Sequence, residues 1–351
     1  MNTASFSSMV RHVVSRRYFA VLVLLIVLFV YFSISQSRFL TSGNIDALIT
    51  GSSILWLVSI GLTFVMLTGG FDLSLGSLLA LSGIAMGTFM NSWGIPLGLA
   101  IVMTLAFGLL VGSLVNGVLI GRAQLPFLVV TLGTLTLYSG IVNLWSNQST
   151  HAVTSNALTG IAFNHALGIP VPAWVMIGVF LVALFVQRST YFGRDVYAVG
   201  GSADAARLSG IRVNGILIAV YGIAGMLAAL AGVMQVARIG AASPQVGGQV
   251  IFSAAAAVLL GGTSFAGGIG GVGGTAIGVL LLATLENGLS VSGVQSYWQQ
   301  IITGLILIAV VGLDRVQQVG VRHALRSMMP TRNAPTGTSP PPPAVVGGGT
   351  K

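Results

Sequence analysis

The sequence contains no cysteine, a single lysine and only six acidic residues. The absence of cysteine excludes a disulfide framework, a thiolate metal site and a cysteine nucleophile. Because the only lysine is Lys351, no glycine-rich segment matches the phosphate loop GxxxxGK[ST], and the chain is not expected to hydrolyse ATP by itself. The four histidines are scattered without the spacing of metal ligands. We therefore expect neither an enzyme nor a metal-binding protein.

Apolar and small residues dominate the rest of the composition. Of the 351 residues, 54% are hydrophobic and 6% are charged, whereas a soluble domain carries charge at about a quarter of its positions. The 48 glycines suit helices that approach closely in a membrane. The net charge of +9 does not indicate nucleic-acid binding, because the basic residues stand at the ends of apolar segments. The composition predicts an all-α, multi-pass membrane protein.

Ten apolar segments are predicted to cross the bilayer. They comprise residues 18–35, 45–67, 74–90, 96–120, 127–144, 174–187, 215–236, 250–265, 270–289 and 297–313. The first is predicted to be a retained helix rather than a signal peptide, because no small-residue cleavage pattern follows it. Several segments are shorter than the roughly 20 residues of a straight span, so broken or re-entrant helices are expected.

The basic residues predict the orientation of these segments. With the N-terminus in the cytoplasm, ten crossings return the C-terminus to the same side. Of the fifteen Lys and Arg residues, only Arg38 and Arg238 then fall outside. The segment 145–173 has no Lys or Arg and is predicted to be an irregular outer loop.

This topology divides the chain into three regions. Residues 1–17 are predicted to form a cytoplasmic tail, residues 18–315 the transmembrane domain and residues 316–351 a second cytoplasmic tail. From about residue 330 the second tail is rich in Pro, Gly and Thr, a composition that cannot bury a core. We predict that this part is disordered.

The segment 188–215 is the only long polar interruption that also carries charge. This segment is predicted to contain a short helix at about 203–209. The prediction rests on a capping residue, an acid in the first helical turn, a base in the last turn and a glycine after the helix. These residues are Ser202, Asp204, Arg207 and Gly210. The pattern fits an ordinary solvated helix as well as a surface that binds a partner.

Two glycine-rich breaks interrupt apolar runs. The first is Thr68-Gly69-Gly70-Phe71-Asp72, and the second, in the other half of the chain, begins with Gly261-Gly262. Asp72 or Ser74 is predicted to cap the helix that follows the first break. If each half holds five spans and one such break, the two halves have opposite orientations in the membrane, because five is an odd number of crossings. Many transporters are built from inverted halves of this kind. Each break is either a capped turn or an element of a gate or path.

Polar residues within apolar runs suggest further candidates. Glu286 starts the triplet Glu286-Asn287-Gly288, and an acid at membrane depth is a functional hypothesis by default, although near a span end it can also bond a neighbouring helix. Asn116, Thr131 and Gln299 are more often contacts between helices than ligands. The predicted translocation path comprises Thr68, Gly69, Gly70, Asp72, Asn116, Thr131, Gly261, Gly262, Glu286 and Asn287.

Five blocks of sequence resemble the membrane permease subunits of bacterial ABC sugar importers of the ribose type, which are distantly related to branched-chain amino-acid permeases. The blocks are FVMLTGGFDLSLGSLLALSGI (64–84), NGVLIGRAQLPFLVVTLGTLTLYSGI (116–141), FGRDVYAVGGSADAARLSGI (192–211), VLLGGTSFAGGIGGVGGTAIG (258–278) and ENGLSVSGVQSYWQQIITGLILIAVVGLD (286–314). The five blocks occur in the order typical of the family and cover about residues 39–314. Their joint occurrence is more specific to the family than any single block.

The chain departs from the family pattern at three places. Ser139-Gly140 stands where the family often has Arg before the glycine. Ile251-Phe252-Ser253 stands where the family commonly has Glu-Leu-Asp, so both acids are gone. Glu286 stands where the family usually has Asn. If those acids matter for ribose-like substrates, a different sugar, polyol or sugar-like solute is expected.

The resemblance implies a complete importer in a bacterial inner membrane. Two permease copies, identical or homologous, would span the lipid bilayer and bind cytoplasmic ATPase subunits, which hold ATP and Mg²⁺. A periplasmic binding protein would deliver the solute, and this chain would bind no cofactor. The predicted short helix and its flanks would be the ATPase-coupling element, formed by Gly200, Gly201, Asp204, Ala205, Ala206, Arg207, Leu208, Ser209 and Gly210.

Three alternatives remain open. A branched-chain amino-acid permease belongs to the related group. An ion-coupled secondary transporter needs membrane carboxylates, and only Glu286 and Asp72 are available. A membrane-embedded enzyme is disfavoured because no catalytic cluster is present.

Overall fold

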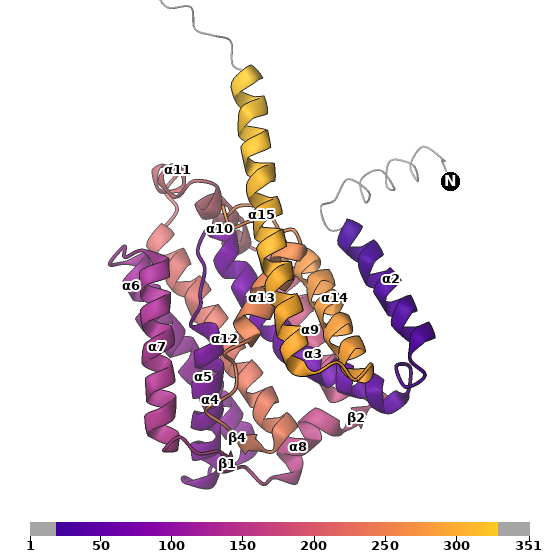
Figure 1. The fold of residues 1–351 in the computed structure, drawn as a ribbon. Helices are drawn as coiled ribbons and strands as arrows, with labels where there is room; N and C mark the ends of the chain where they lie inside the picture. Colours follow the sequence, from indigo (N-terminus) through magenta and orange to yellow (C-terminus); the bar gives the residue numbers. More distant parts are fainter. Residues whose placement is uncertain (1–18, 329–351) are drawn as a thin grey trace, which may run out of the picture. The chain divides into compact units, whose positions relative to one another are not determined.

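Figure 1 shows the computed structural model, which describes residues 19–328 and, among these, the side chains of residues 19–312. Residues up to Asp314 form one compact unit, and the last part of the C-terminal helix belongs to a second. The predicted tail at 1–17 and the predicted disorder beyond residue 330 lie outside the described residues.

Helices account for most of the described chain. They are α2 (Phe19–Ser35), α3 (Ser42–Leu67), α4 (Leu75–Asn91), α5 (Leu97–Val111), the π-helix η1 (Gly112–Gly117), α6 (Val118–Gly121), α7 (Phe127–Ser146), α8 (Asn156–Phe163), α9 (Val171–Ser189), α10 (Tyr191–Gly201), α11 (Ala203–Leu208), α12 (Val213–Ile239), α13 (Val250–Leu260), α14 (Val272–Val291) and α15 (Ser296–Met328). Within residues 19–328, strands are limited to pairs of residues: β1 (His151–Ala152), β2 (His165–Ala166), β3 (Ile169–Pro170) and β4 (Ala241–Ala242).

Six helices are long and apolar enough to cross a membrane: α3, the continuous rod α5–η1–α6, α7, α9, α12 and α14. Four shorter apolar helices accompany them, namely α2, α4, α13 and the first part of α15. Each of the ten predicted segments overlaps one of these helices. The prediction of an all-α, multi-pass membrane protein is therefore confirmed, while the count of ten crossings stays a prediction.

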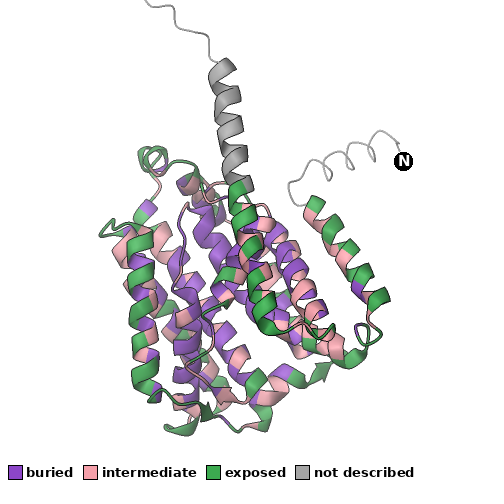
Figure 2. Ribbon diagram, viewed as in Figure 1, coloured by how far each residue is buried: buried purple, intermediate pink, exposed green. Residues whose placement is uncertain are grey.

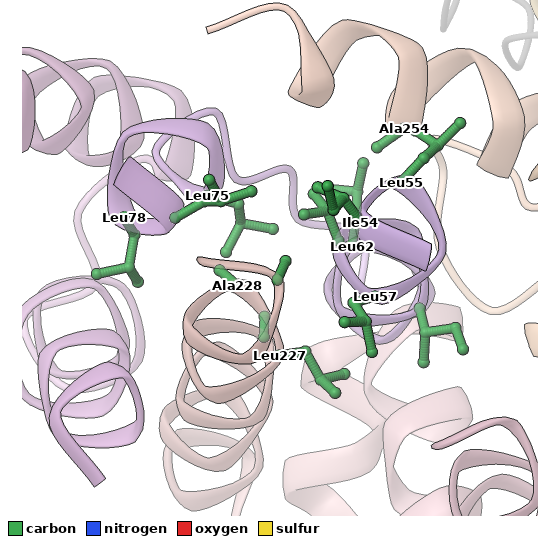
Figure 3. Close-up of a cluster of buried hydrophobic side chains, with 14 of the residues drawn as sticks. Ile54, Leu55, Leu57, Leu62, Leu75, Leu78, Leu227, Ala228 and Ala254 are labelled. Atoms are coloured by element: carbon green, nitrogen blue, oxygen red, sulfur yellow. The ribbon is translucent and has the colours of Figure 1, made fainter. Parts of the chain in front are cut away.

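Helices α3 and α12 form the centre of the bundle. Helix α12 packs along α3, α4 and the rod α5–η1–α6, and Figure 2 shows that buried residues collect on the central helices while α2, α7 and α15 carry exposed ones. Figure 3 shows part of the core, where Ile54 and Leu57 of α3, Leu75 of α4, and Leu227 and Ala228 of α12 are all buried. The outer helices thus expose apolar side chains around a buried core, and a lipid environment permits this arrangement.

Glycine determines how closely α12 approaches the rod α5–η1–α6. A Cβ atom on Gly225 would collide with the carbonyl oxygen of Gly108 and lie 3.0 Å from the Cα of Gly112. Lipid tails are as apolar as side chains, so helices in a membrane associate through such close packing rather than through the hydrophobic effect.

The loops at the end of the bundle opposite α10 and α11 are partly ordered (Figure 1). Strand β1 pairs with β4, and β2 pairs with β3, both antiparallel. The predicted irregular loop at 145–173 also contains α8, whose N-cap Ser155 accepts a hydrogen bond from the Leu158 amide at 3.3 Å. The prediction of irregular structure missed this eight-residue helix, for which Ser155 supplies the capping signal.

The two glycine breaks stand at different places in the order of the apolar helices. The first break follows α3, the second apolar helix, whereas the second break follows α13, the third apolar helix after α8. In an inverted repeat, the counterpart of the first break is thus the segment 240–249 before α13. Gly247 in that segment touches Gly76 at the start of α4, and a Cβ on either would collide with the backbone of the other. The inversion of the halves stays a prediction, and with it the way in which the two breaks correspond.

Replacing Gly225 by Ala is expected to lower the unfolding temperature of the detergent-solubilised protein. The new methyl group must push α12 away from Gly108 and Gly112, and such overpacking typically costs about 1–3 kcal/mol. Gly215→Ala is the control on the same helix, because a Cβ there meets only the Cβ of Arg212 at 3.9 Å. The control is expected to leave the temperature unchanged or raise it. Equal effects of both variants in a thermal-shift assay would contradict the close-packing account.

Candidate translocation and coupling site

Both glycine breaks begin with the same helix-ending motif. After α3, the amides of Gly69 and Gly70 donate back into the last turn at 3.0 and 3.2 Å. After α13, the amides of Gly262 and Thr263 do the same at 2.9 and 3.2 Å. Gly69 and Gly262 have φ values of +81° and +83°. This left-handed conformation ends a helix in the Schellman motif and favours glycine.

The two breaks lie against each other, although they are far apart in the sequence. The amide of Gly268 donates to the carbonyl of Leu67, the last residue of α3, at 2.9 Å. A Cβ on Gly267 would lie 2.8 Å from the amide nitrogen of Gly69. Backbone therefore meets backbone here, with no side chain between.

The polar segment 188–215 reaches the same place through α10, which ends at Gly200-Gly201. A Cβ on Gly200 would collide with the carbonyl oxygen of Leu67 and lie 2.5 Å from the amide nitrogen of Gly268. We call the meeting of residues 67–69, 200–201 and 267–268 the glycine junction. It joins the predicted coupling segment directly to both predicted breaks.

Several residues of each break are buried in protein. Thr68, Asp72 and Thr263 are all buried, and the rings of Phe71 and Phe265 lie 5.3 Å apart between centroids. Backbone groups of a broken helix must be paired within the protein, because hydrocarbon cannot satisfy them.

Asp72 ties the first break to α4 and to the π-helix. One carboxylate oxygen accepts hydrogen bonds from the amide of Ser74 at 2.9 Å and from its hydroxyl at 2.6 Å. The other oxygen accepts from the Asn116 side-chain amide at 3.1 Å, and that amide also donates to Ser74 Oγ at 2.8 Å. Ser74 occupies the N-cap position of α4 without a capping bond from its own side chain. The cap is supplied by Asp72, so the alternative that Ser74 caps the helix is wrong.

Several buried polar atoms near the first break have no partner among the described residues. A Cβ on Gly70 would lie 2.7 Å from the hydroxyl of Tyr221 on α12, and Tyr138 of α7 is also buried. Within the described part of the chain, neither hydroxyl has a hydrogen-bond partner, and neither has the side-chain oxygen of Asn116. The hydroxyl of Thr131 on α7 is likewise buried and unpaired among the described residues. Asn116 and Tyr221 therefore leave hydrogen-bonding capacity beside the break.

The second break is held by two side chains that the sequence did not single out. Gln187, near the end of α9, accepts a hydrogen bond from the Val272 amide at 2.9 Å and donates to the hydroxyl of Tyr197 on α10. That hydroxyl donates to the carbonyl of Gly270 at 2.6 Å. Burial raises the pKa of the Tyr197 phenol above its ordinary value, because burial disfavours the charged phenolate.

The predicted helix at 203–209 forms as α11 (Ala203–Leu208). Ser202 accepts a hydrogen bond from the Ala205 amide at 3.2 Å, and Asp204 pairs with Arg207 at 3.3 Å. Gly210 follows with a φ of +85°. The sequence did not predict α10, which precedes it.

One face of α11 packs against neighbouring helices, and another face is exposed. Ala206 packs against Val199 of α10 and Val213 of α12, and all three are buried. Leu208 is 91% exposed. A large apolar side chain held outward on an anchored helix is suited to contact with another protein.

Glu286 and Asn287 do not join the glycine junction. Asn287 exchanges two amide hydrogen bonds of 3.0 Å with Asn44 of α3. Glu286 accepts a hydrogen bond from Ser253 of α13 at 3.2 Å. Both residues stand near the end of α14 that is remote from α10.

Comparison with protein families matches residues 44–311 to the branched-chain amino acid transport system / permease component family. That match spans most of the chain. The chain belongs to this family. It is therefore a membrane permease and not an enzyme.

The permease is also similar to characterised sugar permeases. It is 39% identical over 303 residues to a ribose import permease protein of Escherichia coli strain K12, covering 85% of this chain and 93% of the relative. It is 35% identical to the D-allose transport system permease protein of the same strain, covering 86% and 92%. It is 32% identical to a xylose transport system permease protein of Haemophilus influenzae, covering 86% and 96%. No solved structure matches it.

Replacing Tyr197 of this permease by Phe is expected to loosen the second break, because the variant cannot donate to the Gly270 carbonyl. Hydrogen exchange of the peptide amides at 267–272 should become faster, since local opening loses the bond that opposes it. Tyr191→Phe is the matched control on the same helix, because Tyr191 is 79% exposed and its ring contact with Arg194 survives the change. Unchanged exchange at 267–272 in Tyr197→Phe would count against the holding role.

Proposed function

We infer that this permease is the membrane subunit of a bacterial ABC importer that carries a sugar or sugar-like solute. The observation that supports this most strongly is the 39% identity to a ribose import permease, which extends over 93% of that protein. Relatives named for ribose, xylose and allose transport all align over most of the chain. Their names share one chemistry, that of an uncharged monosaccharide with several hydroxyl groups.

The topology we propose has ten crossings of the inner membrane. Both termini and the segment 188–215 lie in the cytoplasm, because the basic residues then concentrate inside. The first five apolar helices, α2 to α7, would form one half, and α9 and α12 to α15 the inverted second half. The contact between Gly76 and Gly247 supports this pairing, since each glycine lies where a helix resumes after a break.

The partners of the importer follow from the same proposal. A second permease copy or homologue completes the path through the bilayer. Cytoplasmic ATPase subunits bind ATP and Mg²⁺, and a periplasmic protein delivers the solute to the outer face. This chain binds no cofactor in the cycle.

Energy coupling would run from α11 through α10 to the breaks. Leu208 and Arg207 face outward for contact with an ATPase subunit. Ala206 fixes α11 to α10 and α12, and α10 ends in the glycine junction. Because the backbones there touch without intervening side chains, a rigid displacement of α10 must move both breaks together.

The proposal assigns most of the predicted path residues either to a gate near the cytoplasmic face or to the outer half of the membrane domain. Thr68, Gly69, Gly70, Asp72, Asn116, Gly261 and Gly262 belong to the breaks or brace them, and we assign them to the gate near the cytoplasmic face. Glu286 and Asn287 belong to the outer half. Thr131 lies on α7 with an unpaired hydroxyl among the described residues, and its part in the path rests on that hydroxyl alone.

A branched-chain amino acid is the second candidate solute, because the family description names that class. The two are separated by uptake into proteoliposomes that contain the permease, its ATPase subunits and its binding protein. We expect ATP-dependent accumulation of D-ribose, D-xylose or D-allose and none of L-leucine. Accumulation of L-leucine alone would refute the sugar assignment, and accumulation driven by an ion gradient without ATP would refute the ABC importer.

Replacing Leu208 by Asp is expected to abolish co-purification of the ATPase subunits and ATP-dependent uptake, since a charge would replace the apolar contact at the proposed docking surface. Leu167→Asp is the matched control: Leu167 is 90% exposed and lies between β2 and β3, at the opposite end of the bundle. It should retain the ATPase subunits. If Leu208→Asp retains them as well, α11 is an ordinary solvated helix.

A further inference from the structure

The half of the bundle remote from α10 contains a cavity of about 710 Å³. Its walls come from α3, α12, α13, α14 and α15. Arg238 is the penultimate residue of α12, and Thr303 lies eight residues into α15, roughly 10 Å below its start at 1.5 Å per residue. The cavity therefore reaches from one end of the bundle into its interior.

Polar side chains line much of this cavity, although it lies among apolar helices. They include Gln249 before α13, Ser253 of α13, Glu286 of α14, and Gln299 and Thr303 of α15. Such groups are costly against lipid and are retained where they meet water or a polar ligand. The volume is within the roughly 300–1,000 Å³ of small-molecule pockets.

The charged groups of the cavity are not neutralised by each other. Glu286 and Arg238 form no ion pair among the described residues, and the guanidinium of Arg238 lies over α3 beside Gly51. Glu286 accepts one hydrogen bond, from Ser253 at 3.2 Å. A carboxylate has acceptor capacity for further hydroxyl groups, and glutamine amides can both donate and accept.

Glu286 of α14 and Ser253 of α13 come from different helices, and the structure brings them into direct contact in this cavity. Among the residues that line the cavity, Glu286 is the one that carries a carboxylate. The hydrogen bond from Ser253 occupies one acceptor position of that carboxylate and orients it, so a change at either residue alters the set of hydroxyl groups it can accept.

We propose that this cavity is a solute-selecting site for monosaccharides, in which Glu286 and Ser253 determine which sugar is accepted. The proposal rests on the proposed function and adds a place within this chain where the sugar is recognised after delivery. The Glu286 carboxylate accepts from sugar hydroxyls, and Gln249, Gln299 and Thr303 supply further hydrogen bonds. Recognition is by hydroxyl geometry, so sugars differing in one stereocentre are discriminated.

The absence of native cysteine allows a direct test. In intact cells, Thr303→Cys and Leu305→Cys are labelled with a membrane-impermeant methanethiosulfonate. Thr303 is 7% exposed and lines the cavity, whereas Leu305 is 62% exposed and does not. We expect Thr303→Cys to react about tenfold faster, because only a hydrated thiol ionises and reacts. Gln299→Cys provides a second cavity position should Thr303→Cys fail to insert. Faster labelling of Leu305→Cys than of both cavity positions would overturn the proposal.

Protection then identifies the ligand class. D-ribose, D-xylose and D-allose are each added before labelling, with L-leucine as the unrelated solute. At a sugar concentration equal to the dissociation constant, labelling should slow about twofold, because half of the sites are occupied. If the importer accumulates a sugar but no sugar protects, the cavity proposal fails and the proposed function stands. If only L-leucine protects, the sugar assignment fails at both levels.

The selecting role of the contact is tested by moving the carboxylate from position 286 to position 253. Ser253→Asp with Glu286→Asn, placed in the Thr303→Cys background, should change which of the three sugars protects best. Leu305→Asn in the same background is the control and should leave the order unchanged. An unchanged order in the double variant would show that these two residues do not select the sugar.

Discussion

A backbone amide or carbonyl in hydrocarbon has no water with which to pair, and the arrangement of this permease depends on that constraint. Unbroken helices satisfy it internally. Wherever a helix ends inside the bundle, the remaining groups need partners from elsewhere in the protein. The carbonyl of Leu67, at the end of α3, receives its hydrogen bond from the amide of Gly268 in the other break. This hydrogen bond thus satisfies one backbone group from each side of the contact.

The same constraint explains why polar side chains stand where they do. Asp72 accepts from the backbone and side chain of Ser74 at the start of α4, and Gln187 accepts from the amide of Val272 at the start of α14. Both helices resume inside protein, where an unpaired amide would cost about 1–3 kcal/mol or more. Asp72 and Gln187 therefore substitute for the missing turn of a helix. Only groups with capacity to spare, such as Glu286 and the hydroxyls of Tyr138 and Tyr221, remain for a solute or water.

Several elements followed from local patterns. Each predicted apolar segment overlaps an apolar helix, because hydrophobicity sustained over many residues is a strong signal. Helix α11 was predicted from Ser202 and Gly210, since caps act over one turn and need no distant partner. Helices α8 and α10 were missed, although each follows a residue that caps it, Ser155 and Thr190. The role of Tyr197 was missed because its partner, Gly270, lies far along the chain.

The sequence by itself determined the composition, the apolar segments, the positions of the helix breaks and the family, because each depends on residue type or short-range order. The tertiary structure decided which breaks meet. It placed the Gly200 backbone against Leu67 and Gly268, and it brought Ser253 of α13 into contact with Glu286 of α14. These contacts join residues far apart in the chain, and they depend on the absence of a Cβ or on the direction of a side chain. No local pattern encodes either, because close packing of helices is decided by the surfaces of both partners at once.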